Sequence, residues 1–264
     1  MLGKLLKYEL KASARTFFPL YLALIVVSII AGLSGKTTSI LAQGISGFVM
    51  GGLFVSLVVL TIMVIIQRFS KNLLEDEGYL MFTLPVSSKT LILSKCLSSC
   101  IFGVLSFTVA MFVMFILMIS VGGIEVFKYM PEVFSEIFKW LFNFQNALDL
   151  LTIIITGILG FASFIVLVYF VLSLGQLPRF NRHRKLVAFV AFIVILVLLS
   201  ILQSFLGQFI PALSGSMDTY YTGVYYGHLY NNPGMLAVLI WTLAQVLAFF
   251  FGTSYILDNK LNLE

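Results

Sequence analysis

The sequence predicts an all-α integral membrane protein with six transmembrane helices. Hydrophobic residues make up 60% of the 264 residues and charged residues only 10%, whereas soluble globular domains carry about 25% charged residues. The mean hydropathy is +1.07. So few charged side chains cannot cover the surface of a soluble fold of this length. This composition excludes a water-soluble enzyme, and it also excludes a disordered or nucleic-acid-binding chain despite the net charge of +5.

Six stretches of the chain contain no Asp, Glu, Lys or Arg, and their lengths range from 20 to 39 residues. A helix needs about 20 apolar residues to cross a hydrocarbon core of about 30 Å. Each stretch therefore holds one crossing, within a single transmembrane domain over 1–264. With boundaries placed by prolines, glycines and charges, the expected spans are 17–35, 45–67, 97–122, 150–174, 187–209 and 235–257.

Lys and Arg are distributed unequally between the two ends of these spans. Thirteen lie in the N-terminal segment, the C-terminal tail and the connections after the second and fourth spans. Only Lys36, Lys128 and Lys139 lie in the other connections. Because cytoplasmic connections carry an excess of Lys and Arg, this asymmetry predicts that both termini are cytoplasmic.

Residues 1–16 are expected to form an amphipathic connecting helix ahead of the first span. At 100° per residue, this helix has a basic face and an apolar face. The basic face carries Lys4, Lys7, Lys11 and Arg15, and the apolar face carries Leu2, Leu5, Leu6 and Leu10. Such a helix lies in the membrane interface with its cations toward anionic head groups. It acts either as a topology anchor or as an elbow that transmits motion. Its apolar continuation is too long for a typical cleaved signal peptide.

Small residues mark two of the expected spans. Gly47 and Gly51 are one helical turn apart, so they favour a close helix contact that is either internal or a dimer seam. Cys96 and Cys100 would share a helix face, but two thiols alone make neither a closed zinc site nor a disulfide framework. We expect them to be ordinary small residues of a membrane helix.

No expected span carries an ionisable residue near its centre. Ion-coupled transporters and intramembrane proteases need such groups at membrane depth, so we expect no catalytic residue, no metal ligand and no cofactor on this chain. Gly35-Lys36-Thr37 imitates the end of a phosphate-binding loop, but Ile30 stands where that pattern requires glycine. A nucleotide site is therefore expected only on another chain.

The cytoplasmic segment 68–95 is unusually apolar for a connection between spans. Its central residues are Glu75, Asp76, Glu77, Gly78, Tyr79, Leu80, Met81, Phe82, Thr83, Leu84 and Pro85. Exposed apolar side chains of this kind should be buried against something. The segment either packs on the membrane surface itself or docks on a cytoplasmic partner. Ser87 or Ser88 can cap the helix that follows.

The expected outer connection 211–234 is rich in tyrosine. It contains Tyr220, Tyr221, Tyr225, Tyr226 and Tyr230. These side chains form either an aromatic belt at the membrane interface or a segment that caps an outward-facing vestibule.

Two of these segments resemble parts of a known family. The sequence from Lys4 to Lys11 looks like the start of permease subunits of ABC-2-type transporters, and 75–87 is similar to the segment between their second and third spans. The resemblance implies that Glu75–Pro85 docks into a separate ATPase and that 4–15 is the connecting helix. It also implies an assembly of two permeases, identical or different, with two ATPase subunits that bind the ATP and Mg.

Bacterial relatives of this size without a fused ATPase often resemble exporters that confer resistance to peptide antibiotics. The resemblance therefore implies a multi-pass protein of the bacterial plasma membrane that moves an amphipathic or hydrophobic cargo. Two other functions remain open, namely a membrane scaffold or sensor that recruits a different cytoplasmic partner, and a passive channel. The lack of a large soluble domain disfavours the first, and the lack of polar rings in the spans disfavours the second.

Overall fold

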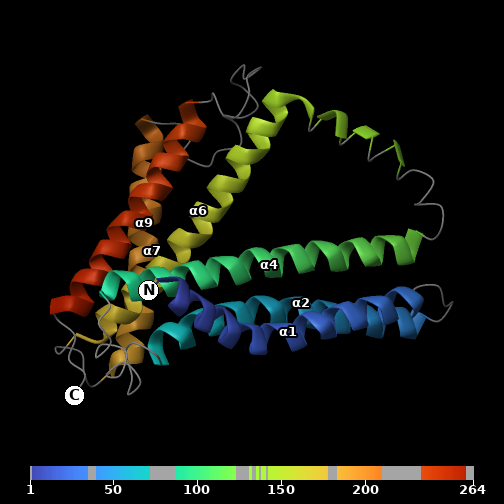
Figure 1. Cartoon of the computed structure of the whole chain (residues 1–264), viewed down its shortest axis with the longest axis horizontal. Coiled ribbons are helices and arrows are strands. Elements are labelled where there is room, and N and C mark those ends of the chain that lie inside the picture. Colours follow the sequence, from blue (N-terminus) through green and yellow to red (C-terminus); the bar gives the residue numbers. More distant parts are fainter. Residues whose placement is uncertain are drawn as a thin grey trace. The chain divides into compact units, whose positions relative to one another are not determined.

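The computed structural model confirms the all-α fold in the part of the chain that it describes (Figure 1). The described residues are 2–34, 40–71, 87–122, 131–132, 135–136, 138–140, 142–177, 183–209 and 233–259. Six long helices occupy most of these residues, and no strand occurs among them. The helices are α1 (Leu2–Ser34), α2 (Ile40–Phe69), α4 (Ser88–Gly122), α6 (Phe144–Gly175), α7 (Arg184–Phe209) and α9 (Pro233–Asn259).

All six helices are long and apolar enough to cross a membrane. Four of the apolar stretches lie within four residues of the predicted spans at both ends: Gly47–Phe69, Asn146–Gly175, Arg184–Gln208 and Met235–Asn259. If these six helices of the described residues each cross once, both termini lie on the same side. The assignment of that side to the cytoplasm stays a prediction.

The first helix is longer than its predicted span, because the amphipathic segment and the span form one helix, α1. Pro19 lies inside α1, where proline removes one backbone hydrogen bond. A single packing face runs through this position and favours the helix on both sides of it. The buried residues of that face follow one another at spacings of three or four: Glu9, Ser13, Phe17, Tyr21, Leu24, Ser28 and Ala31.

Helix α4 starts at Ser88, where the sequence predicts a cap, and continues through the predicted span 97–122. Ser87 immediately precedes it, as the sequence predicts for a cap. The carbonyl of Ser87 accepts hydrogen bonds from the backbone N–H of Thr90 at 2.9 Å and of Leu91 at 3.3 Å. Ser87 Oγ also lies 2.9 Å from Thr90 Oγ1. Lys89 and Lys95, predicted in the connection, therefore lie on the first turns of α4.

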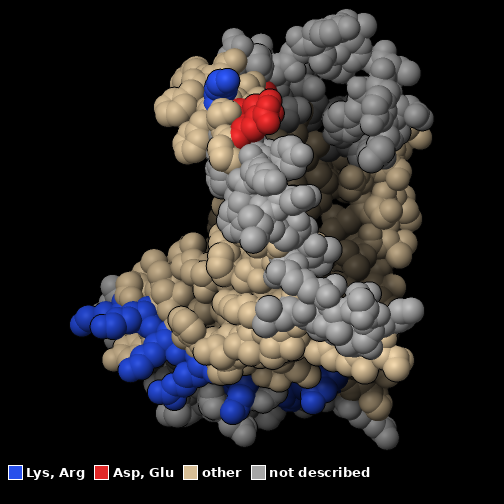
Figure 2. Space-filling view, turned by 90° about the vertical axis from the view of Figure 1, so that its right-hand side faces the viewer, with Lys and Arg blue, Asp and Glu red and all other residues tan. Residues whose placement is uncertain are grey.

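The surface of the described residues is largely apolar. In the space-filling view most of the described surface is uncharged, and Lys, Arg, Asp and Glu occupy only small areas (Figure 2). Large hydrophobic side chains such as Phe48 and Ile240 are 85% and 70% exposed. A soluble protein buries such side chains, whereas a membrane protein presents them to lipid.

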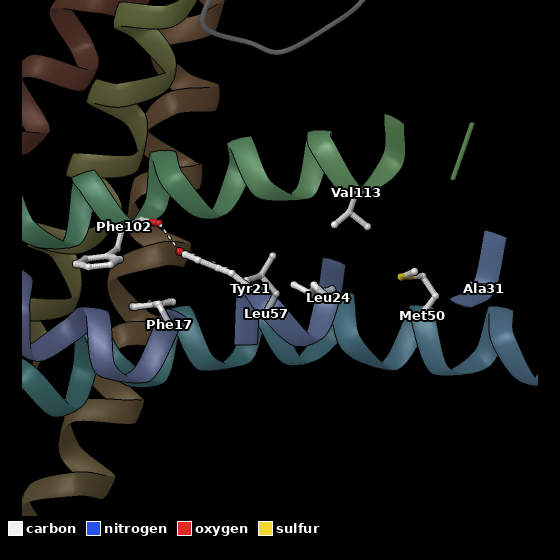
Figure 3. Close-up of a cluster of buried hydrophobic side chains, with 8 residues drawn as sticks. All are labelled: Phe17, Tyr21, Leu24, Ala31, Met50, Leu57, Phe102 and Val113. Carbon is white, nitrogen blue, oxygen red and sulfur yellow. Dashed lines mark hydrogen bonds between the residues drawn. The ribbon is translucent and has the colours of Figure 1, made fainter. Parts of the chain in front are cut away.

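The helices form two compact units, and the expectation of a single transmembrane domain over 1–264 stays a prediction. The first comprises Met1–Gln67 and Leu97–Lys139, and the second comprises Arg68–Cys96 and Trp140–Glu264. In the first unit, side chains of α1, α2 and α4 point toward one another (Figure 3). Phe17 stacks on Phe102 of α4 with ring centroids 4.9 Å apart. Tyr21 reaches α4 as well, with its hydroxyl oxygen 2.7 Å from Ser106 Oγ.

In the second unit, α6 packs against both α7 and α9. Ser163 of α6 donates a hydrogen bond to Gln245 Oε1 of α9 at 3.0 Å. At the end of α6, a Cβ on Gly175 would lie 2.7 Å from the carbonyl oxygen of Arg184 at the start of α7. Only glycine permits this close approach of two backbones.

Candidate functional site

The predicted coupling residues Glu75–Pro85 lie outside the described residues, as does all of 72–86. The described residues on either side of this segment show how it is held. The end of α2 from Arg68 and the start of α4 up to Cys96 both belong to the second unit, together with α6, α7 and α9. The candidate site is therefore built from the second unit.

The α2 side of the segment is held by an aromatic stack. Phe69, the last residue of α2, stacks on Tyr169 of α6 with ring centroids 4.2 Å apart and an interplanar angle of 9°. Both side chains are fully buried. Beyond Phe69 the chain continues in a wider π-helical turn at Ser70 and Lys71, a local geometry that is frequent at functional sites. The chain thus enters 72–86 directly from a rigid contact with α6.

On the α4 side of the segment, an exposed residue of α4 contacts α9. The ammonium nitrogen of Lys89 lies 5.9 Å from the centroid of the Phe251 ring, within the distance of a cation–π interaction. On the next two turns of α4, Leu91, Ile92 and Lys95 are buried, whereas Leu93 is exposed. The side chain of Lys95 is only 1% exposed. The chain therefore leaves 72–86 into a helix start that has one buried face.

These two contacts meet on adjacent residues of α6 and α9. Phe170 follows Tyr169, and its ring occupies the space where Gly252 has no side chain, since a Cβ on Gly252 would lie 2.7 Å from Phe170 Cε2. Phe170 also contacts Phe249, with ring centroids 5.5 Å apart. We name the set of these residues the anchor cluster: Phe69, Lys89, Tyr169, Phe170, Phe249, Phe251 and Gly252.

The anchor cluster ties both ends of 72–86 to the α6–α9 pair. Phe69 and Tyr169 are fully buried and Phe170 packs into Gly252, whereas Lys89 and Phe251 are exposed. A displacement at the α2 end of the segment would therefore act on α6 through Phe69, and the weaker contact of Lys89 links the α4 end to α9. The arrangement suits mechanical transmission, and it requires no acid–base group.

The predicted connecting-helix residues all lie on the surface. Lys4, Lys7, Lys11 and Arg15 are exposed on α1, and Leu2, Leu5, Leu6 and Leu10 are partly buried. Sequence reasoning missed Glu9 and Ser13, which are 7% and 3% exposed. Their spacing of four residues, continued by Phe17 and Tyr21, is the signal that could have identified them.

The glycines of α2 do not serve internal packing among the described residues. A Cβ on Gly44, Gly47, Gly51 or Gly52 would meet no other atom within 4 Å. Of the two roles left open for Gly47 and Gly51, a close internal contact is therefore not seen among the described residues, and the dimer seam stays a prediction.

Two other predictions concern metals and the outer connection. In the part of the chain that the structure describes, no group of three or more His, Cys, Asp or Glu side chains could hold a metal ion. Cys96 and Cys100 are half-buried on α4. The tyrosines of 211–234 lie outside the described residues, so the two roles considered for them stay open.

Comparisons with known proteins return no relative. No protein-family model matches the chain, and no curated protein or solved structure does either.

Proposed function

We propose that this chain is the membrane-spanning permease subunit of an ATP-driven transporter of the ABC-2 type. The protein itself catalyses no reaction in this proposal, and ATP and Mg bind to a separate cytoplasmic ATPase. That ATPase docks on Glu75–Pro85, and a second permease copy completes the membrane part. The cargo is amphipathic or hydrophobic, and the location is the bacterial plasma membrane.

The observation that carries the proposal is the anchoring of both ends of 72–86 on one helix pair. Phe69 joins the segment to α6 and Lys89 joins it to α9, and Phe170 packs into Gly252 between those helices. A simple connector between two spans needs no such attachment. A docking element that moves helices needs this attachment, because a displacement of the element must be transmitted to the transmembrane helices through its two ends.

Two further features support the proposal. The six apolar helices provide the membrane part, and the apolar character of 79–84 provides a surface for a protein partner. The scarcity of ionisable groups along the spans suits a cargo recognised by Phe, Met and Leu side chains.

The test is to purify the tagged full chain from its source membrane in mild detergent and to assay the material for ATP hydrolysis. We expect a soluble ATPase in equimolar amount. The variant Glu75→Gln/Asp76→Asn/Glu77→Gln should lose it. The control Glu132→Gln/Glu136→Gln removes two exposed carboxylates elsewhere and should retain the ATPase. A stable, well-folded wild-type protein without any ATPase would overturn the proposal and favour the scaffold or the channel.

A further inference from the structure

One buried polar atom of the second unit lacks a hydrogen-bond partner. The indole nitrogen Nε1 of Trp241 on α9 is shielded from solvent, and it has no hydrogen-bond partner among the described residues. An unpaired N–H group in an apolar interior is costly, because it has lost its bonds to water and gained none in return. A second arrangement that supplies an acceptor to Trp241 therefore gains a hydrogen bond.

An acceptor lies one helical turn away on α9. Gln245 follows Trp241 by four residues, so the two side chains are neighbours on the helix surface. Long side chains of a helix lean toward its N-terminus, so a change of the Gln245 rotamer can bring Oε1 to the indole N–H. In the structure, Gln245 Oε1 instead accepts a hydrogen bond from Ser163 Oγ of α6 at 3.0 Å. The amide oxygen thus serves the bond between the two helices while the indole N–H stays unpaired.

Ser163 has a second way to use its hydroxyl group, and Trp241 does not. A serine within a helix can donate to a backbone carbonyl three or four residues earlier in the chain. Ser173 on the same helix does so, with its Oγ 2.7 Å from the carbonyl oxygen of Phe170. If Gln245 turns to Trp241 and Ser163 turns to a carbonyl of α6, each of the three side chains has a partner.

The three side chains lie near the middle of the apolar stretches of α6 and α9, which are Asn146–Gly175 and Met235–Asn259. In the low dielectric of a membrane interior, a hydrogen bond is stronger and an unpaired donor is more costly than near water. Seven residues beyond Ser163 and Gln245, Phe170 packs against Gly252. The exchangeable bond therefore belongs to the helix pair that carries the anchor cluster.

We infer that Ser163, Trp241 and Gln245 form a hydrogen-bond switch between α6 and α9. In the latched state Ser163 donates to Gln245 and joins the helices, and the Trp241 N–H has no partner. In the released state Trp241 donates to Gln245 within α9, and Ser163 donates to a carbonyl of α6. The released state has one more hydrogen bond but lacks the bond between the helices, so the pair can separate. The switch is independent of the proposed transport function, because its three residues need neither an ATPase nor a second permease.

The first test reads the indole N–H directly. It uses the full chain with Trp140→Phe in lipid nanodiscs, because Trp241 is then the only tryptophan. Ultraviolet resonance Raman spectra distinguish a hydrogen-bonded indole N–H from a free one, and we expect a free signal with a bonded component. Ser163→Ala should leave only the bonded signal, because it frees Gln245 Oε1, and Gln245→Leu should leave only the free signal. The matched control Thr156→Val removes a hydroxyl group that bonds its own helix and should leave both signals unchanged.

The second test measures the separation of the helices. Spin labels are attached to cysteines introduced at the exposed positions Ile154 of α6 and Leu236 of α9, in a chain whose two native cysteines are replaced by serine. Trp241→Phe removes the competing donor, so the distribution of label distances should narrow to its shorter component. Ser163→Ala removes the bond between the helices, so only the longer component should remain.

Three outcomes would overturn the inference. A free N–H signal that Ser163→Ala leaves unchanged would show that Trp241 does not compete for Gln245. A bonded signal that survives Gln245→Leu would show that Trp241 has another acceptor. Equal distance distributions in Trp241→Phe and Ser163→Ala would show that the exchange of bonds does not move the helices. Ser163→Ala removes a single oxygen atom, so it tests the competition even where Gln245→Leu fails to fold.

Discussion

Phe69 and Tyr169 are 100 positions apart in the sequence, and their rings stack almost parallel with centroids 4.2 Å apart. The stack places the last residue of α2 against the C-terminal half of α6. In the predicted topology this half of α6 is the cytoplasmic one. Any movement of the chain just beyond Phe69 therefore acts on α6.

Substituting Phe69 tests this relationship. Phe69→Ala should lower the free energy of unfolding by about 3 kcal/mol, because it removes a fully buried ring and leaves a cavity. The control Phe48→Ala removes a ring that is 85% exposed and should change stability little. Unfolding by a denaturing detergent in mixed micelles, followed by tryptophan fluorescence, measures both. Equal effects of the two substitutions would contradict the assignment of Phe69 to a packed contact.

Replacing Gly252 by alanine, which adds a single methyl group, should already lower the stability of the protein. In Gly252→Ala the new Cβ would lie 2.7 Å from Phe170 Cε2 and 3.0 Å from Cδ2, so the ring must shift at a cost of about 1–3 kcal/mol. Gly157→Ala is the matched control, since a Cβ there meets nothing within 4 Å. Gly157→Ala should raise the free energy of unfolding by about 1 kcal/mol, because alanine has the higher helix propensity.

The same clash predicts a rescue. Adding Phe170→Leu to Gly252→Ala should restore part of the lost stability, so that the two effects are strongly non-additive in a double-mutant cycle. Additive effects would mean that the two residues do not share a contact.

Tyr21 joins α1 to α4 by a hydrogen bond that should contribute only modestly to the free energy of unfolding. Its hydroxyl oxygen lies 2.7 Å from Ser106 Oγ and 3.4 Å from the carbonyl oxygen of Phe102. Hydrogen bonds between membrane helices average about 0.6 kcal/mol, so a cycle of Tyr21→Phe and Ser106→Ala should give a coupling energy near that value. Thr108 bonds the carbonyl of Val104 on its own helix, so Thr108→Val should show no coupling to Tyr21→Phe.

The proposed coupling role predicts a loss of transport without a loss of folding. Glu77→Gln should uncouple ATP hydrolysis by the partner from cargo movement while the chain still inserts into the membrane. The measurement compares the ATPase rate and cargo efflux of cells or vesicles that carry each variant, with Glu132→Gln as the control. Normal transport by the Glu77 variant would show that the coupling role is wrong.

The sequence was sufficient to predict the helices wherever an apolar run ends at a charge or a breaker. The span 235–257 was predicted almost to the residue, because Pro233 begins α9 and Asp258 lies at its end. Charge counting finds the edge of the hydrocarbon and not the end of a helix, so the spans alone did not show where α1 and α4 begin. The amphipathic pattern of 1–16 and the cap at Ser87 or Ser88 supplied those starts, whereas the fusion of the amphipathic segment and the first span into one helix was not predicted.

The anchor cluster could not have been predicted from the sequence. Each of its contacts joins residues of different helices, and the pairing depends on how each span is rotated about its axis. Phe170 and Gly252 look like any other phenylalanine and glycine of an apolar run. The buried stripe of α1 was predictable, because Glu9, Ser13, Phe17 and Tyr21 repeat within a single helix.

The full length of α4 does not set how the protein responds to membrane thickness. At about 1.5 Å per residue its 35 residues extend about 52 Å, well beyond a hydrocarbon core of about 30 Å. The 26 residues of α7 extend only about 39 Å. The first turns of α4 carry Lys89 and Lys95, however, so only the 27 residues after Lys95 are free of charge, and they extend about 40 Å. The apolar parts of α4 and α7 are therefore similar in length, and the extra turns of α4 project beyond the core. Because a thicker bilayer is matched by the apolar stretch of a helix and not by its full length, the projecting turns of α4 add no tolerance to hydrophobic mismatch.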